Sequence, residues 1–201
     1  MEFLMKILAI GAHFDDVEIG CGGTLLKHVK KGDEVYIAVT SSDEHRTGNI
    51  KERVFEQQAA AELMGLPDKC LFLFAETDSD ADIIGPLDLI EPDIVYCHHE
   101  QDTHQAHRRS SIVAQAVGRK QHITTLFYDS GSTYDFHPNV FSLIDYERKH
   151  AVLRCYQSQI IHGAINLDRV KKKNSFWATL ITPNPRAYAE GFKVRKLLWE
   201  I

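Results

Sequence analysis

The sequence lacks an apolar run long enough to cross a membrane, and it is poor in cysteine. No stretch approaches the roughly 18 consecutive apolar residues that a spanning helix needs. The apolar N-terminal run is interrupted by Lys6 and ends in the acidic pair Asp15 and Asp16, so it lacks the features of a signal peptide. The 4 cysteines are scattered without a CxxC pair, which argues against a disulfide framework. We therefore expect a cytoplasmic protein.

The sequence also has few proline and glycine residues, and it has no excess of positive charge. The 201 residues include 6 Pro and 12 Gly, with 44% hydrophobic and 25% charged residues, a globular composition rather than a disordered or fibrous one. Lys and Arg number 23 against 28 Asp and Glu, so the net charge of -5 gives no general attraction for nucleic acid or an anionic membrane. The length predicts a single domain over residues 1–201.

What the sequence does contain is an alternation of short apolar runs with helical patterns. The apolar runs predict buried strands at residues 6–12, 34–40, 71–74, 93–97 and 125–128. The helical patterns lie at residues 22–31, 50–64, 104–120, 146–159 and 167–176, with one short helix expected within 76–90. Residues 20–23 (GCGG) do not match a dinucleotide-binding GxGxxG and predict a tight turn before the first helix. This order predicts an α/β, Rossmann-like, mostly parallel sheet sandwiched by helices.

Two of the predicted strands end in segments rich in histidine and acidic residues. The first strand continues into HFDDVE at residues 13–18, and the fourth into HHEQDTHQAH at residues 98–107. Ligands of open parallel sheets bind beyond the carboxyl ends of the strands. If these two strands are neighbours, imidazoles and carboxylates from both segments converge on one crevice.

The spacing within these segments favours a metal site. His13 and Asp16, three residues apart on a turn, together with one histidine of the second segment would supply the three N and O ligands of a catalytic metal. His104 and His107 share one face of a helical turn, so one could bind the metal while the other handles protons. A single histidine or aspartate at a strand end is more often a helix cap or a hydrogen-bonded turn residue than a metal ligand. The coincidence of two such segments favours the metal.

The same segments carry a resemblance to a known family. AHFDDVEIGCGGTL resembles the AHPDDxE signature of the LmbE/PIG-L family of zinc-dependent N-deacetylases, and DTHQAH resembles its second motif, DxHxDH. Weaker similarities follow in the same order at residues 53–56, 136–138 and 156–159, so the likeness extends over about residues 5–160. It implies a hydrolase that uses zinc to remove the N-acetyl group from an N-acetylated amino sugar or its conjugate, a small-molecule partner.

The resemblance also implies roles for individual residues. Zinc would be bound by three ligands, His13, Asp16 and His107. Asp15 would be the general base, and His104 the acid or the donor to the oxyanion. Arg53 resembles the family's substrate-contacting arginine, although an exposed arginine paired with a glutamate of its own helix explains it equally well.

Two residues depart from the family pattern. Phe14 stands where the family usually has proline, which alters the shape of the loop more than its chemistry. Ala106 stands where relatives carry an aspartate that orients the neighbouring histidine. Either Asp102 or Glu100 substitutes for it, or His104 is less basic than in relatives. A catalytically weakened metal- or sugar-binding member of the fold therefore stays open.

Other classes fit the sequence less well. A receiver-like signalling domain predicts an aspartate after the third strand and a lysine after the fifth, but Ala75 and Asp129 stand there. A non-haem iron enzyme would also use two histidines and one carboxylate, but the strand and helix alternation disfavours it. The sequence leaves open the sugar conjugate and association between copies of the chain.

Overall fold

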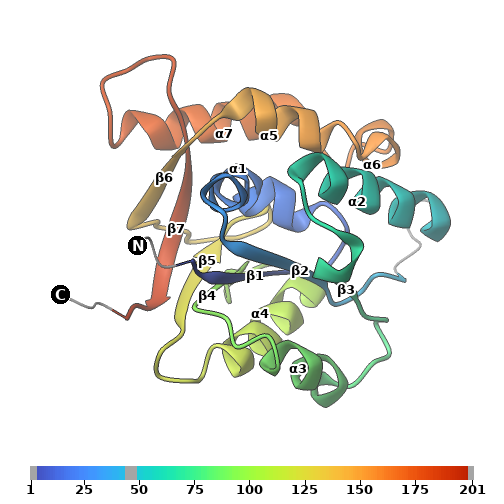
Figure 1. Ribbon diagram of the computed structural model, residues 1–201. Coiled ribbons are helices and arrows are strands. Elements are labelled where there is room, and N and C mark those ends of the chain that lie inside the picture. The colour runs from blue at the N-terminus through green and yellow to red at the C-terminus, as the bar shows by residue number, and fades with distance from the viewer. Residues whose placement is uncertain (1–3, 44–48, 199–201) are drawn as a thin grey trace.

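Five apolar segments of the sequence form the parallel part of one seven-stranded sheet, with the strand order β3-β2-β1-β4-β5-β7-β6 (Figure 1). The computed structural model describes residues 4–43 and 49–198. The parallel strands are β1 (Lys6–Gly11), β2 (Glu34–Val39), β3 (Leu71–Leu73), β4 (Ile94–His98) and β5 (Thr124–Tyr128). β7 (Tyr188–Lys196) pairs antiparallel with both β5 and the edge strand β6 (Val140–Ile144).

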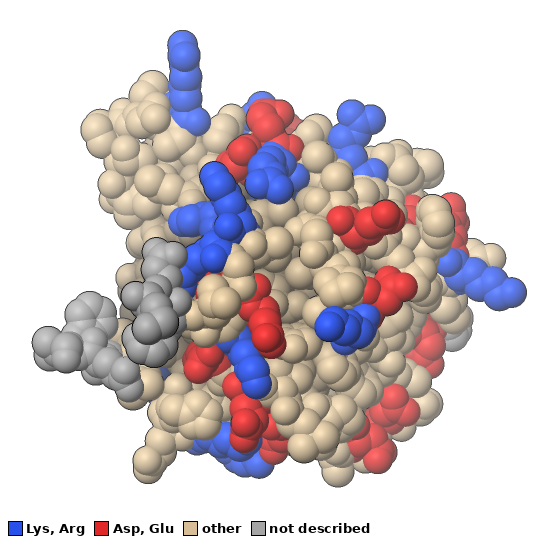
Figure 2. Space-filling model, in the orientation of Figure 1, with Lys and Arg blue, Asp and Glu red and all other residues tan. Residues whose placement is uncertain are grey.

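Helices cover both faces of this sheet. The helices are α1 (Asp16–Lys31), α2 (Ile50–Met64), α3 (Asp80–Asp88), α4 (Gln105–Val117), α5 (Tyr146–Leu153), α6 (Gln157–Ile161), α7 (Leu167–Thr179) and the short 3-10 helix η1 (Asp68–Cys70). Figure 1 shows α3 and α4 on one face, and α1, α2, α5, α6 and α7 on the other. Among the described residues, no helix combines the length and apolarity needed to span a bilayer. Acidic and basic side chains both occur across the face drawn in Figure 2.

The core is divided by the sheet into two apolar clusters. Along β1, Ile7 and Ala9 pack into the cluster beneath α1, α2 and α5, while Leu8 and Ile10 pack into the cluster beneath α3 and α4. A strand that is apolar on both faces is typical of a parallel sheet covered by helices. The predicted Rossmann-like α/β fold is therefore confirmed.

The helices predicted at residues 104–120 and 167–176 differ from α4 and α7 by at most three residues at an end, but two other predicted helices differ more. The helix predicted at residues 22–31 begins at Asp16, because the left-handed Asp15 turns the chain directly into it. The helix predicted at residues 146–159 is broken into α5 and α6. Both the backbone N–H and the hydroxyl of Ser158 donate to the buried Glu56 carboxylate at 2.6 Å, so α6 starts anew against α2.

The expected tight turn at residues 20–23 is wrong, because these residues lie within α1. A Cβ added at Gly20 would lie 2.2 Å from Cδ2 of Tyr128, and one at Gly23 would lie 2.8 Å from Ile144. The glycines, three residues apart, share one face of α1. They let the helix backbone approach β5 and β6 more closely than any side chain would permit.

This close approach predicts opposite effects for two glycine substitutions. Gly20→Ala is expected to lower the free energy of unfolding by about 1–3 kcal/mol, because the added methyl group overlaps the buried ring of Tyr128. Gly22→Ala is the matched control, since the nearest atom to its added Cβ is 3.5 Å away. It should raise stability by roughly 0.5–1 kcal/mol through helix propensity. Urea unfolding would measure both, and equal stability of the two variants would contradict the close-packing argument.

The strand order also determines where a ligand can bind. The chain moves from β1 outward to β2 and β3, and then returns to β4 and β5 on the other side of β1. β1 and β4 are thus neighbours, with Ile10 opposite Cys97. The topological switch point of such a sheet lies between these strands, at their carboxyl ends. Both histidine-rich segments emerge there, so the condition under which the sequence predicted their convergence is met.

Candidate functional site

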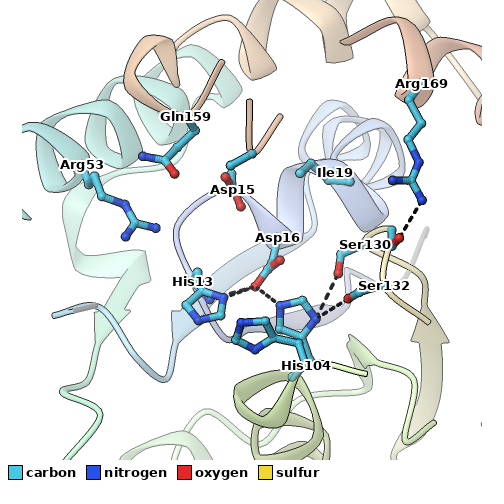
Figure 3. A pocket seen from close by; sticks show the side chains of 13 residues that line it. His13, Asp15, Asp16, Ile19, Arg53, His104, Ser130, Ser132, Gln159 and Arg169 are labelled. Atoms are coloured by element: carbon cyan, nitrogen blue, oxygen red, sulfur yellow. Dashed lines mark hydrogen bonds and ion pairs between the residues drawn. The ribbon is translucent and has the colours of Figure 1, made fainter. Parts of the chain in front are cut away.

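A pocket of about 350 Å³ opens at this switch point (Figure 3). Its volume lies near the lower end of the range of about 300–1,000 Å³ found for small-molecule sites. All the predicted site residues line it, namely His13, Asp15, Asp16, Arg53, His104 and His107. Residues from the loop after β1, from α2 and from the start of α4 are thus brought to one cavity.

One carboxylate oxygen, Oδ2 of Asp16, is the centre of the cluster. It lies 3.3 Å from Nδ1 of His13 and 3.4 Å from Nε2 of His107. It also accepts the backbone N–H of His13 at 2.8 Å, which holds the loop around the carboxylate. Burial opposes ionisation of Asp16, but the His107 and His98 imidazoles hold its pKa well below the usual range. A carboxylate kept ionised among imidazoles is a ready ligand for a cation.

The donor atoms of this cluster are suited to a metal ion. They form two overlapping groups, His13 with His104 and His107, and Asp16 with His98 and His107, each with ligand atoms within 4.8 Å of one another. Imidazole nitrogen together with carboxylate oxygen is the donor chemistry of catalytic zinc and also of non-haem iron. His107 is the residue that these two groups share.

His98 is a cluster member that the sequence did not single out. It ends β4 and is fully buried, with its ring stacked on that of His107 at a centroid distance of 4.0 Å. Its Nε2 lies 3.2 Å from both the Asp16 carboxylate and the backbone N–H of Ala12. Burial lowers the pKa of His98. The signal available in the sequence was its position directly after the predicted strand at residues 93–97.

Asp102 lies beside the imidazole of His107, whereas its hydrogen bond with His104 is to the backbone. Its Oδ2 lies 3.1 Å from Nδ1 of His107, while its Oδ1 accepts the backbone N–H of His104 at 2.8 Å and the hydroxyl of Ser132 at 2.7 Å. Although burial acts in the other direction, these hydrogen bonds hold the pKa of Asp102 well below its usual range. A carboxylate behind a metal-binding histidine orients the ring and makes its other nitrogen more basic. Glu100, the other candidate, is exposed.

Asp15 faces the pocket from a strained backbone. Its φ of 96° is in the left-handed region, which few residues other than glycine adopt and which aspartate tolerates better than most. Its carbonyl accepts the N–H of Ile19, so the residue caps α1 and its carboxylate is left to face the cavity. Burial and the neighbouring Asp16 raise the pKa of Asp15 well above its usual value, while Arg53 acts in the opposite direction.

Arg53 is buried rather than exposed. It is 2% exposed, and its guanidinium carbon lies 5.5 Å from the centroid of the Phe14 ring. The alternative of an exposed surface arginine is therefore wrong. Phe14, the residue that replaces the family's proline, is itself fully buried and supplies an aromatic face for this cation. The departure from the motif thus helps to place Arg53 at the pocket wall.

Further residues that the sequence did not name individually also line the pocket. Ser130 and Ser132 follow β5, whose carboxyl end lies beside that of β4. Gln159 comes from α6, and Arg169 from the first turn of α7. The position of the serines after a strand could have indicated them. Nothing in the sequence pattern indicates that α6 and α7 reach the same cavity.

Comparison with known proteins agrees with this arrangement. The PIG-L family, described as GlcNAc-PI de-N-acetylase, matches residues 8–118. The uncharacterized deacetylase YaiS of Escherichia coli (strain K12) is 32% identical over 154 residues, which cover 70% of this chain and 83% of that protein.

Solved structures share the fold. The conserved protein TT1542 from Thermus thermophilus has a TM-score of 0.82 at 22% identity over 98% of both chains. N,N'-diacetylchitobiose deacetylase from Pyrococcus horikoshii has a TM-score of 0.79 at 21% identity, covering 94% of this chain and 83% of that one. The family match includes both histidine-rich segments. The chain therefore belongs to the PIG-L deacetylase family.

Proposed function

We propose that this protein is a zinc-dependent hydrolase that removes the N-acetyl group from an N-acetylated amino sugar or its conjugate, releasing acetate and a free amine. The observation that carries the proposal is the convergence of two distant segments on one pocket. His13 and Asp16 from the first segment meet His107 from the second, and Asp15 lies beside them. This supplies a candidate metal site and a proton acceptor in a cavity sized for a small molecule.

The residues proposed to hold zinc are His13, Asp16 and His107. They supply two imidazole nitrogens and one carboxylate oxygen, a set of three protein ligands that leaves a position for water. When bound, zinc lowers the pKa of water to about 7 and polarises an amide carbonyl. Asp102 supports the set by accepting the Nδ1 proton of His107, so that Nε2 of this ring is available as a ligand.

Asp15 and His104 are proposed to move the protons of the reaction. The Asp15 carboxylate accepts a proton from the water that attacks the amide carbonyl carbon. His104 lies against both other histidines of its group, with ring centroids 4.8 Å from His13 and 4.6 Å from His107. From this position a protonated His104 donates to the carbonyl oxygen as it becomes negative, and its proton reaches the nitrogen as the C–N bond breaks.

Arg53 is proposed to bind the sugar. Its guanidinium belongs to the pocket wall on α2 and is held against Phe14, so its donors are directed by packing rather than by solvent. A fixed fork of N–H donors suits vicinal hydroxyl groups or an anionic oxygen. Gln159, whose amide lines the same wall, adds a further polar contact for hydroxyl groups.

Acetate release together with metal analysis tests the proposal. The protein, purified without added metal, would be assayed for bound zinc and iron and for acetate and amine release from a panel of N-acetylglucosamine conjugates. We expect zinc and equimolar release of both products. Stoichiometric zinc without release from any conjugate would favour a catalytically weakened member, and iron in place of zinc would favour the non-haem iron alternative.

The position of Asp102 behind His107 predicts a selective effect on metal affinity. Asp102→Asn is expected to weaken zinc binding by about 10–100-fold, because the imidazole loses a charged hydrogen-bond acceptor. Competition with a chromophoric chelator would measure the dissociation constant. Glu100→Gln removes an exposed carboxylate of the same loop and serves as the control. Equal zinc affinity of Asp102→Asn and the wild type would contradict this role of Asp102.

A further inference from the structure

A second cavity lies at the opposite end of β5 from the histidine cluster. Its volume is about 250 Å³, and it is bounded by the C-terminal end of α4, the start of β5 and the end of β7 (Figure 1). The residues that line it are Gln115, Gly118, Arg119, Thr125, Arg195 and Lys196. The pocket with the histidine cluster is lined instead by residues such as Ser130, which follows the other end of β5. The two cavities are therefore separate sites.

A β-bulge turns two consecutive cationic side chains toward this second cavity. In the antiparallel pairing of β5 with β7, Leu126 lies opposite Val194. The next pair is Thr125 with Lys196, so Arg195 is an extra residue on β7. Successive side chains of a regular strand point to opposite faces, but a bulge changes the direction of a side chain. The bulge thus allows Arg195 and Lys196 to line the same cavity.

Both cationic groups are held in place by neutral partners. Nε of Arg195 donates to Oε1 of Gln115 at 3.2 Å, which orients the guanidinium. The guanidinium carries further donors on both Nη atoms. Nζ of Lys196 donates to the backbone carbonyls of Gly118, at 2.6 Å, and Lys120, at the end of α4. An ammonium group has one more N–H donor than these two bonds use. The contacts therefore position the two cations without neutralising them.

The wall of this cavity has more positive than negative charge. Arg119 is neutralised by Asp88, with Nη2 at 2.6 Å from Oδ2. Arg195 and Lys196 take part in no ion pair within residues 4–43 and 49–198. Burial and the neighbouring Arg195 lower the pKa of Lys196, because both disfavour its positive charge. An anion bound between the two cations would offset this repulsion.

A buried hydroxyl group adds a neutral donor to the same wall. Thr125 is 2% exposed and lines the cavity. A Cβ added at Gly118 would lie 2.5 Å from Oγ1 of Thr125, so a side chain at residue 118 would displace this hydroxyl. Guanidinium, ammonium and hydroxyl groups on one wall are the donors that bind the oxygens of a phosphate group.

We propose that this cavity binds a phosphate dianion, either free or as the phosphate group of a small phosphomonoester, through Arg195, Lys196 and Thr125. Paired N–H donors of a guanidinium match two phosphate oxygens, and the ammonium adds a point charge. The volume lies below the range of about 300–1,000 Å³ found for small-molecule sites, which favours a small anion. The site is independent of the proposed deacetylase function, because binding here involves no residue of the histidine cluster.

Calorimetric titration of the zinc-loaded protein at low ionic strength tests this site. The probes are inorganic phosphate and glycerol 3-phosphate. We expect Arg195→Gln to weaken binding of both probes by roughly tenfold, through loss of charge-assisted hydrogen bonds. Arg195→Lys, which keeps the charge but not the paired donors, should recover part of the loss. Thr125→Val, which keeps the shape but not the hydroxyl, should weaken binding by about two- to tenfold. Phosphate bound at the zinc would be insensitive to these substitutions.

Arg154→Gln is the matched control. Arg154 is an exposed arginine directly after α5, on the other face of the sheet (Figure 1). Its loss removes the same charge and should leave the affinity for both probes unchanged. Absence of binding by the wild type, or equal affinities of the wild type and Arg195→Gln, would overturn the site. So would an equal loss in Arg154→Gln, since that would be a response to net charge alone. With the site present, the tighter of the two probes identifies its ligand as free phosphate or a phosphomonoester.

Discussion

Asp15→Asn is expected to keep its metal and its fold while turnover falls by a factor of about 10²–10⁴, the contribution of a general base. The amide of asparagine cannot accept the proton of the attacking water. Asparagine has the same shape as aspartate and tolerates the left-handed backbone that residue 15 adopts, with φ of 96°. Steady-state kcat and zinc content measured on one preparation would test this.

His13→Ala is the comparison that makes the result specific. His13 lies 3.3 Å from the Asp16 carboxylate and is a proposed ligand, so its loss should reduce both zinc content and turnover. Asp15→Asn should reduce turnover alone. Full activity in Asp15→Asn would remove Asp15 from the mechanism, and loss of zinc from it would make Asp15 a ligand instead of a base.

Lys149→Met is expected to lower the free energy of unfolding by about 3–5 kcal/mol, because it leaves a buried carboxylate without its cation. Lys149 is fully buried and donates to Glu190 at 2.6 Å and to the carbonyl of Ile19 at 2.8 Å. Glu190 in turn accepts the backbone N–H groups of Gly23 and Thr24 in α1. The pair thus joins α5, β7 and the interior of α1. Urea unfolding of the variant would measure the loss.

Lys172→Met provides the matched control for this buried pair. Lys172 also pairs with a carboxylate at 2.6 Å, but its side chain is 76% exposed. Solvent screening limits the contribution of such a surface pair to below about 1 kcal/mol. If Lys149→Met were no less stable than Lys172→Met, the buried pair would not contribute to the stability of α1.

Five of the six predicted site residues could be located from the sequence because they follow two recognisable strands, whereas Arg53 on α2 was indicated by the family resemblance alone. The two strands end at Gly11 and His98, and the five residues lie in the segments that follow them. Ligand sites of parallel sheets occur at strand ends, so local pattern was enough to locate His13 and Asp16. The same reasoning located His104 and His107.

Other site residues depend on which segments become neighbours. His98 contacts Asp16 only because β4 pairs directly with β1. Arg169 reaches the pocket because the start of α7 lies near the loop after β5. There its guanidinium donates a hydrogen bond to the backbone carbonyl of Gly131. No periodicity in the sequence records such contacts, because they form between residues far apart along the chain.

By itself, the sequence determined the alternation of strands and helices and the sign of the chain's net charge. It also determined which side chains follow the first and fourth strands. These follow from local patterns of apolar and polar residues. Only the tertiary structure decided that β1 lies beside β4, that the glycines of α1 serve close packing and that Asp102 supports His107. Each of these is a contact across the chain, and its energy depends on distance in space rather than on separation in sequence.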